Sequence, residues 1–462
     1  MAPIRVGGAS NTVIEPMPGD THDMNGGYGH KAVWRIAAPM ILSSISTPLV
    51  GLVDTALMGH LDRPSYLAGV AAGAIIFSIL FMSLNFLRMG TTGIAAQAFG
   101  SGDHSAIFKS LAQPMLIAIV LAALLLLVQS PTIDLSVWLL GLSNETAGFT
   151  EQYFSIRMWS APAALANFVV IGWLLGMQNA RGPLAIVLTI NVTNIVLDVL
   201  LVLGLDLNIR GVAMATVCAE IAGLLVGLGF VLTNLRQHSP NWRVAGMFDL
   251  ETYRRLLGIN SNLFFRSIAL MFTFAFITAQ GARMGDIVLA ANALLLNFQL
   301  FLSYALDGIA HAAEALTGKA VGARNQAGLR LAVQRTLLWS MLFAALFSVF
   351  YLVSGAAIIN LLTNLQEIRT TAYKYLPWVV ILPLLSAGAF LYDGVFVGTT
   401  RSREMRIIMV GSLVLVFLPV WYGTTALGNH GLWLAFVMFM AVRSLAMHLW
   451  YRRLNSTNQL LG

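Results

Sequence analysis

The sequence carries little charge for its length. Of its 462 residues only 10% are Asp, Glu, Lys or Arg, whereas 58% are hydrophobic and the mean hydropathy is +0.77. A soluble domain of ordinary size cannot bury so much apolar surface, so the composition excludes an ordinary soluble protein. We therefore expect a chain that lies in a lipid bilayer.

Cysteine and several catalytic motifs are also scarce. The single cysteine, Cys218, excludes an internal disulfide and a cysteine-based metal cluster, and we interpret it as a packing residue. The sequence contains no Gly-x-Ser-x-Gly nucleophile elbow, no P-loop and no HExxH zinc motif. We expect that the protein is not an enzyme, that it hydrolyses no ATP and that it needs no cofactor.

Long apolar segments are what the sequence does contain. The runs QPMLIAIVLAALLLLVQ, from Gln113 to Gln129, and LLWSMLFAALFSVFYLV, from Leu337 to Val353, are typical of membrane helices. Each is close to the roughly 20 residues that cross a hydrocarbon core of about 30 Å, and about twelve such segments can be placed. The predicted fold class is an all-α membrane protein with about 12 transmembrane helices.

Lysine and arginine are distributed unevenly between the two sides of these segments. If the N-terminus is cytoplasmic, about three times as many basic residues lie at cytoplasmic helix ends as outside, which is what the positive-inside rule predicts. Both termini should therefore face the cytoplasm. Anionic lipid headgroups explain the net charge of +7, so we expect no nucleic-acid partner.

Two halves of the sequence resemble each other at one constant offset. LAGVAA at Leu67 resembles LAANAL at Leu289, and QAFGSGD at Gln97 resembles KAVGARN at Lys319. Because an even number of crossings returns the chain to its starting side, the halves are two six-helix repeats in the same orientation. Paired bundles of this kind hold substrate near the midplane and work by alternating access, so the repeat predicts a transporter.

The repeat divides the chain into five predicted parts. They are a disordered N-terminal tail (1–30), an N-lobe (31–233), a cytoplasmic linker (234–260), a C-lobe (261–453) and a C-terminal tail (454–462). The repeat is architectural only, because Asp54 and Asp198 of the first half align with Phe276 and Val420 of the second.

The stretch NVTNIVLDVLLVLG, from Asn191 to Gly204, combines a membrane-type helix with polar residues. Spacings of three and four place Asn191, Asn194 and Asp198 on one helix face. An ionised side chain at the centre of a membrane helix costs roughly 2.5–3.5 kcal/mol, so this face should point into the bundle. The cluster could hold helices together or bind an ion. Asp54, five residues before Gly59, could also simply reach the outer interface.

Several motifs are similar to those of one transporter family. IAAPM around Pro39, followed by LVDTALMGHL, resembles the first helix of MATE (multidrug and toxic compound extrusion) transporters. NLFFRSIAL and LDGIAHAAEALTGKAVG resemble the DNA-damage-inducible, DinF-type branch of that family, and the resemblance extends from Lys31 to Arg453. It implies V-shaped lobes and a monomer in the bacterial inner membrane. The implied function is a secondary antiporter that exports amphipathic organic cations or other toxic compounds in exchange for H⁺ or Na⁺.

The resemblance also implies which residues bind the coupling ion. The family's N-lobe cation site falls on Asp54, Asn194, Asp198 and Thr216, and its helix-bending proline falls on Pro39. Burial and a neighbouring like charge favour protonation of one of the two carboxyl groups, Asp54 or Asp198. The oxygen atoms of the four side chains would also be suitable ligands for Na⁺. The choice between proton and sodium stays open, and Asn191 and Arg88 are candidates for polar support.

The second half has charged residues of its own within predicted helices. They are Arg266, Asp307, His311, Glu314 and Asp393. Spacings of four and three place Asp307, His311 and Glu314 on one face, and Arg266 could neutralise an acid. These residues form either a buried ion-pair network that fixes C-lobe packing or a second coupling or substrate site.

A flippase for lipid-linked or amphiphilic substrates is the alternative function, because related two-lobed transporters handle such molecules. Few intramembrane arginines are present to bind a phosphate, which disfavours it. The expected partners are therefore small-molecule drugs or organic cations and the lipid bilayer.

Overall fold

The computed structural model describes residues 27–59, 64–238, 249–457 and 459–461. Among these residues the chain is helical apart from turns and contains no strand. Almost all of the predicted N-terminal tail lies outside the described residues, as do some side chains within the helices, including that of Asp54.

Nine α-helices form the described part of the N-lobe. Their bounds are α1 His30–Gly59, α2 Pro64–Leu84, α3 Phe86–Ser101, α4 His104–Leu127, α5 Gln129–Leu140, α6 Asn144–Arg157, α7 Ala161–Gly176, α8 Arg181–Asp198 and α9 Asn208–His238. A short 3₁₀ turn, η1 (Met158–Ser160), joins α6 to α7, and a π-helix, η2 (Val199–Gly204), continues α8.

The C-lobe contains the remaining helices. They are α10 Leu250–Arg283, α11 Asp286–Gly322, α12 Gln326–Leu362, α13 Gln366–Gly398, α14 Ser402–Ser412, α15 Leu418–Gly423 and α16 Asn429–Ser456. A second π-helix, η3 (Leu413–Phe417), lies between α14 and α15, and a 3₁₀ turn, η4 (Thr425–Leu427), precedes α16.

Eleven helical segments among the described residues are long and apolar enough to cross a membrane. Some combine two elements, such as α2 with α3 and α6 with α7. Helix α1, with 30 residues, adds one more, so the predicted set of about twelve membrane helices is confirmed. Large apolar side chains such as Leu127 and Leu361 are exposed on the outside of the lobes, where lipid would cover them.

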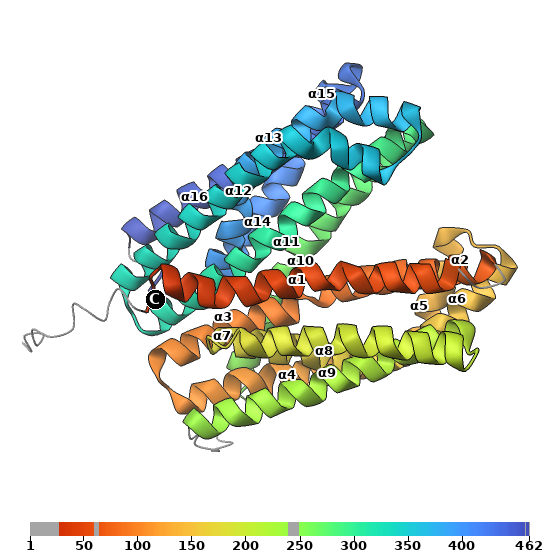
Figure 1. Cartoon of the computed structure of the whole chain (residues 1–462). Coiled ribbons are helices and arrows are strands. Elements are labelled where there is room, and N and C mark those ends of the chain that lie inside the picture. Colours follow the sequence, from red (N-terminus) through yellow and green to blue (C-terminus); the bar gives the residue numbers. More distant parts are fainter. Residues whose placement is uncertain (1–26, 60–63, 239–248, 458, 462) are drawn as a thin grey trace, which may run out of the picture.

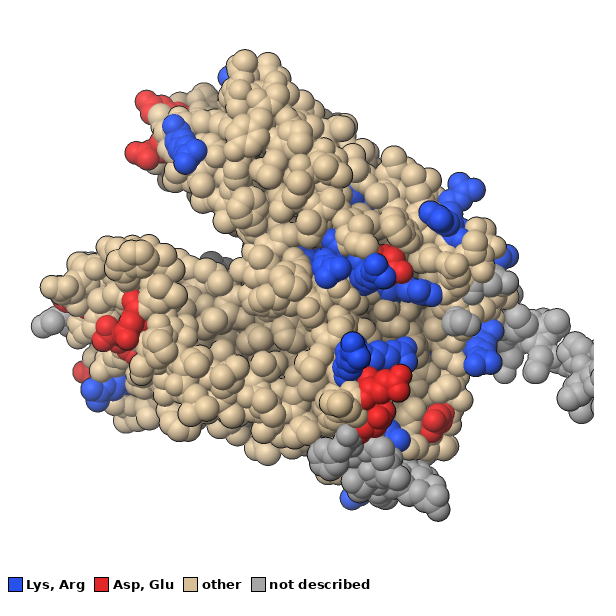
Figure 2. All heavy atoms as spheres, turned by 180° about the vertical axis from the view of Figure 1, so that it is seen from behind, with Lys and Arg blue, Asp and Glu red and all other residues tan. Residues whose placement is uncertain are grey.

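The two lobes touch at one end and diverge at the other, so that the molecule is V-shaped (Figure 1). The start of α1 and the C-terminus lie at the end where the lobes touch, which we call the closed end. Figure 2 shows the wedge-shaped cleft between the lobes, open at the opposite end. Lys and Arg side chains gather over the closed half of that view.

Helices α3 and α11 join the lobes at the closed end. The side-chain amide of Gln97, in α3, donates a hydrogen bond to the carbonyl oxygen of Gly398 at 2.9 Å. Gln178, which follows α7, donates in the same way to the carbonyl oxygen of Ala315 in α11 at 2.8 Å. Because both bonds reach backbone atoms of the other lobe, they help to hold the lobes together at this end.

The predicted linker, residues 234–260, is helical for much of its described length. Helix α9 continues to His238, and α10 begins at Leu250 after an N-cap, Asp249, that accepts hydrogen bonds from the N–H groups of Glu251 and Thr252. The Thr252 hydroxyl also donates to Asp249, and this bond is the main cause of a lowered pKa of that carboxyl. The polar composition of residues 234–260 therefore indicates where the apolar spans end, but the helices α9 and α10 extend beyond those spans.

Candidate cation-binding site

The polar face of α8 points into the N-lobe, as its spacing predicts. Asn194 is 2% exposed and Asp198 is 0% exposed, whereas Val192 and Val196 on the opposite face are 58% and 57% exposed. Asn191 is also buried. A helix with apolar residues outside and amide and carboxylate groups inside is suited to a polar site shielded from lipid.

Asn194 reaches across to α9. Its amide nitrogen lies 3.3 Å from the hydroxyl oxygen of Thr216, which itself donates to the carbonyl oxygen of Val212 at 3.1 Å. The other amide atom, Asn194 Oδ1, is a buried acceptor that receives no hydrogen bond in the described part of the chain. The structure therefore brings together two of the predicted ligands, Asn194 and Thr216. It leaves Asn194 Oδ1 able to accept a hydrogen bond or to bind a cation.

Asn191 connects this face to α1. Its amide donates a hydrogen bond of 2.9 Å to the hydroxyl of Ser46, a residue that our sequence reasoning did not select. Helices α1 and α8 run in the same direction (Figure 1). At 1.5 Å per residue, Asp54 lies about 12 Å beyond Ser46 and Asp198 lies about 10 Å beyond Asn191. The two acids are thus at similar depths along neighbouring helices.

Helix α1 itself is continuous from His30 to Gly59 and contains Pro39 and a second proline, Pro48, which sequence reasoning missed. Near Pro39 the C-lobe approaches closely. A methyl group added to Gly308 in α11 would lie 2.9 Å from the backbone nitrogen of Ile41. Any bend of α1 at this proline would therefore change its contact with α11.

The backbone of α8 changes immediately after Asp198. Residues Val199–Gly204 form a π-helix, and Leu205 donates its N–H to the carbonyl of Leu200 at 3.0 Å. Single π-turns inside α-helices are often found at functional sites. This change could not be predicted from the sequence, because residues 199–204 are all typical of a regular membrane helix.

The C-lobe charges form two clusters. In the first, the Asp393 carboxylate of α13 is paired with Arg266 of α10 and with Arg443 of α16. One acid thereby connects three helices, as the packing interpretation requires. Arg443 had not been selected, although an arginine inside a membrane span needs a counter-charge and this could have identified it.

The second cluster lies between the lobes. Arg88 of α3 lies 3.5 Å from Glu314 and 3.4 Å from His311, both in α11, and the imidazole of His311 lies 3.1 Å from Glu314. The sequence makes Arg88 a candidate for polar support of the N-lobe acids, but its guanidinium contacts C-lobe residues instead. Asp307, one turn before His311, lies within electrostatic range of His311 and Arg88.

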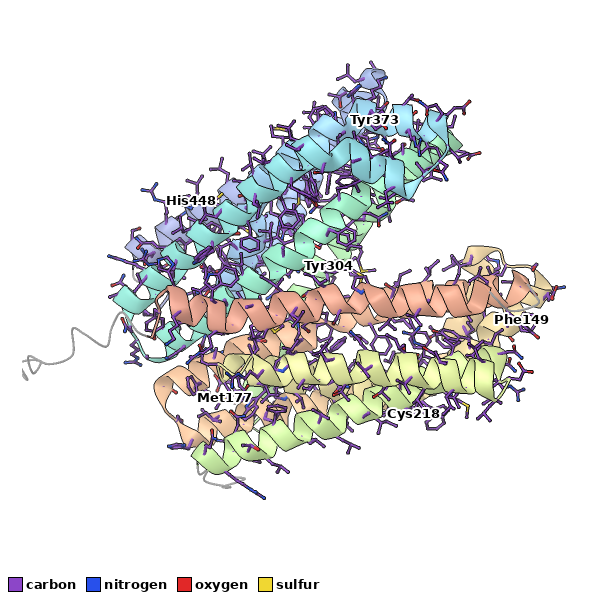
Figure 3. All side chains as sticks on the ribbon, in the orientation of Figure 1. Phe149, Met177, Cys218, Tyr304, Tyr373 and His448 are labelled. Carbon is purple, nitrogen blue, oxygen red and sulfur yellow. The ribbon has the colours of Figure 1, made fainter. Side chains whose placement is uncertain are left out.

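Two further side chains differ from expectation. Cys218 is exposed on α9 and does not pack inside the lobe (Figure 3). Glu220, two residues later, is a carboxylate within a membrane span that sequence reasoning missed, although its spacing of four from Thr216 places it on the same face.

Comparison with known proteins identifies the family. A family profile described as MatE matches residues 39–200 and 263–423, one segment in each lobe. The chain is 45% identical over 428 residues to DNA damage-inducible protein F of Escherichia coli (strain K12), covering 92% of each protein. It is 22% identical over 399 residues to multidrug export protein MepA of Staphylococcus aureus (strain MSSA476), covering 86% of this chain and 87% of that protein.

Solved structures show the same fold. A MATE protein crystallised in the bent conformation matches with a TM-score of 0.85 at 19% identity, over 94% of this chain and 97% of that one. An outward-facing MATE family multidrug resistance transporter matches with a TM-score of 0.83 at 19% identity, over 94% and 98%. Together with the profile match in both lobes and the 45% identity, these likenesses establish that the chain is an integral membrane transporter that belongs to the MatE family, in its DinF-type branch.

Proposed function

We propose that this transporter is a secondary antiporter that exports amphipathic organic cations and other toxic compounds in exchange for H⁺ or Na⁺. The names of two relatives, a multidrug export protein and a protein DETOXIFICATION 44 of Arabidopsis thaliana, support this substrate class. We also propose that it acts as a monomer in the bacterial inner membrane with both termini in the cytoplasm. The gathering of Lys and Arg at the closed end supports that orientation (Figure 2).

The observation that carries the proposal is the fully buried carboxylate of Asp198 on the same face as the Asn194–Thr216 pair. These residues supply a carboxylate, an amide oxygen without a donor among the described residues, and a hydroxyl. Such oxygens suit Na⁺, and a buried carboxyl also suits a proton. Asp54 would complete the set from α1.

The membrane potential can drive such a cycle through this site. Moving one positive charge inward across 100 mV is worth about 2.3 kcal/mol, which is enough to bias an equilibrium between two conformations. We propose that ion binding bends α1 near Pro39. That bend would alter the contact of α1 with Gly308 and exclude drug from the cleft, so that ion and drug bind alternately.

The buried arginines argue against the alternative of a flippase. A phosphate-bearing lipid headgroup would need unpaired cationic side chains within the cleft. Arg88 is paired with Glu314, and Arg266 and Arg443 share Asp393, so these three guanidinium groups already have acidic partners.

Transport in proteoliposomes tests the proposal. Purified protein would be reconstituted, and uptake of the cationic dye ethidium would be recorded under a proton gradient or a sodium gradient imposed separately. We expect one gradient to drive transport in the wild type, and Asp198→Asn and Asp54→Asn to abolish gradient-driven transport while dye binding in detergent persists.

A matched control lies on the same hairpin as Asp198. Asp206 is exposed in the connection between η2 and α9, so Asp206→Asn removes one carboxylate without touching the buried face and should transport as the wild type does. Retention of antiport in both Asp198→Asn and Asp54→Asn would overturn the proposal. Transport of a fluorescent phospholipid without any ion gradient would favour the flippase.

A further inference from the structure

Glu220 of α9 is held by a buried asparagine of the neighbouring helix. The amide nitrogen of Asn167, in α7, lies 2.8 Å from Glu220 Oε2 and 2.9 Å from the carbonyl oxygen of the same residue. Asn167 is 2% exposed. Glu220 lies twelve residues after Asn208, about 18 Å along the helix and thus near the middle of a hydrocarbon core of about 30 Å.

The second amide atom of Asn167, its oxygen, indicates the protonation state of Glu220. Asn167 Oδ1 is buried and accepts no hydrogen bond among the described residues. Beside an ionised carboxylate, which only accepts hydrogen bonds, that oxygen cannot be satisfied. A protonated carboxyl has an O–H donor, and an amide facing a carboxylic acid can then form two reciprocal hydrogen bonds. One of these two bonds, from Asn167 Nδ2 to Glu220 Oε2, is already present.

The charged groups around Glu220 are few. Arg157, at the end of α6, is near enough for its charge to act on Glu220, and it also stacks at 4.6 Å over the ring of Phe77. Helix α8, which packs against α9, carries the buried acid Asp198 at its C-terminal end. Helices α2 and α7 and the short elements η1 and η2, which also pack against α9, carry no charged side chain among their described residues.

We propose that Glu220 and Asn167 form a second proton-binding site of the N-lobe, which holds a proton in the conformation described and releases it during transport. The proton comes from water and returns to water, and only the O–H bond of the Glu220 carboxyl forms and breaks. Thr216 lies one turn away on the same helix, so this site adjoins the candidate cation site through α9. The role in transport rests on the proposed antiport, whereas the protonation itself does not.

Infrared difference spectroscopy of the purified full chain tests the protonation directly. In the wild type at pH 7 we expect a C=O stretching band of a protonated carboxyl that is lost on titration to high pH. Glu220→Gln imitates the protonated acid, because its amide can donate to Asn167 Oδ1 and accept from Asn167 Nδ2, so the variant should fold and lack that band. A band of undiminished size in Glu220→Gln would overturn the proposal.

Two further variants make the assignment specific. Glu151→Gln, at an exposed position of α6, should keep the whole band. Asn167→Ala should keep a band from Glu220 but shift its frequency, since the hydrogen-bonded partner is lost, and it tests the pair even if Glu220→Gln folds poorly. An unshifted band in Asn167→Ala would contradict the pairing.

Proton release tests the role in transport. In weakly buffered detergent solution, ethidium added to the wild type should release protons, and Glu220→Gln should release about one fewer per chain. Equal release by the two proteins would overturn the role of Glu220 in the cycle. If ethidium binds neither protein, the proposed drug transport fails, and the infrared titration still decides whether Glu220 is protonated.

Discussion

Gly322 in α11 and Gln97 in α3 are in backbone contact across the two lobes. A methyl group added to Gly322 would lie 1.9 Å from the carbonyl oxygen of Gln97, and one added to Gly100 would lie 2.1 Å from the carbonyl oxygen of Lys319. Gly100 and Gly322 occupy equivalent places in the two sequence repeats, as do Gln97 and Lys319. The matching segments QAFG and KAVG therefore pack against each other in an approximately symmetric contact that closes one end of the cleft.

The first prediction concerns this contact. Gly322→Ala should force the lobes apart at the closed end, because a methyl group cannot fit against a backbone carbonyl at that distance. Overpacking costs roughly 1–3 kcal/mol, so the equilibrium should shift about 5- to 150-fold toward the conformation that is open at this end. Spin labels at His104 and Ala323, both exposed at the closed end, would measure the change in distance in a Cys218→Ala background.

The control for this prediction is Gly258→Ala in α10, where an added methyl group meets no atom within 4 Å. It should leave the label distances unchanged. If Gly322→Ala also gives the wild-type distance distribution, then α3 and α11 do not form the gate at this end.

The second prediction concerns Thr216. Thr216→Val keeps the shape of the side chain but removes the hydroxyl that accepts a hydrogen bond from Asn194, whereas Thr216→Ser keeps it. A typical hydrogen bond contributes about 0.5–1.5 kcal/mol, so we expect the concentration of the driving ion at half-maximal transport to rise roughly two- to tenfold in Thr216→Val only. Thr233→Val serves as a control, because this exposed residue of α9 donates its hydroxyl hydrogen to the carbonyl of Gly229 on the same helix.

Relations between residues close together in the sequence could be predicted, whereas contacts between helices far apart in the sequence could not. The inward face of α8 followed from the helical repeat, since Asn191, Asn194 and Asp198 lie within two turns. The two-lobed fold could be predicted from the similarity of the two sequence halves and from the apolar spans. Neither the helical periodicity nor this similarity indicates which helices become neighbours. The contacts of Ser46 with Asn191 and of Asn167 with Glu220 therefore could not be predicted.

Charged residues within the membrane spans show the same limit of prediction. An arginine within a membrane span predicts that a counter-charge exists but does not identify it. From the sequence Arg88 is a candidate partner of the N-lobe acids, yet the structure places it beside Glu314 of the C-lobe. Partners across the interface between the lobes depend on the arrangement of the lobes as well as on the sequence.

The third prediction distinguishes packing from transport in the C-lobe. Asp393→Asn leaves Arg266 and Arg443 without their common acidic partner, and breaking a buried ion pair on one side typically costs about 3–5 kcal/mol. We expect a much lower thermal unfolding temperature in detergent. Asp134→Asn, at an exposed position of α5, should unfold as the wild type does. An unchanged unfolding temperature in Asp393→Asn with loss of transport would instead indicate a second coupling site.

The fourth prediction concerns the pair that joins the lobes, Arg88 and Glu314. Arg88→Gln removes the guanidinium that contacts both Glu314 and His311, and a hydrogen bond to a charged group contributes about 1.5–3 kcal/mol. Because the bond spans the lobes, its loss should shift the population roughly 10- to 150-fold toward separation at the closed end, as measured with the same spin labels. The exchange Arg88→Glu with Glu314→Arg restores opposite charges and should recover part of the closed population. If the single variant and the exchange behave alike, the attraction between these two side chains does not hold the lobes together. The backbone contact of Gly322 with Gln97 and the hydrogen bonds that Gln97 and Gln178 donate across the lobes would then have to do so.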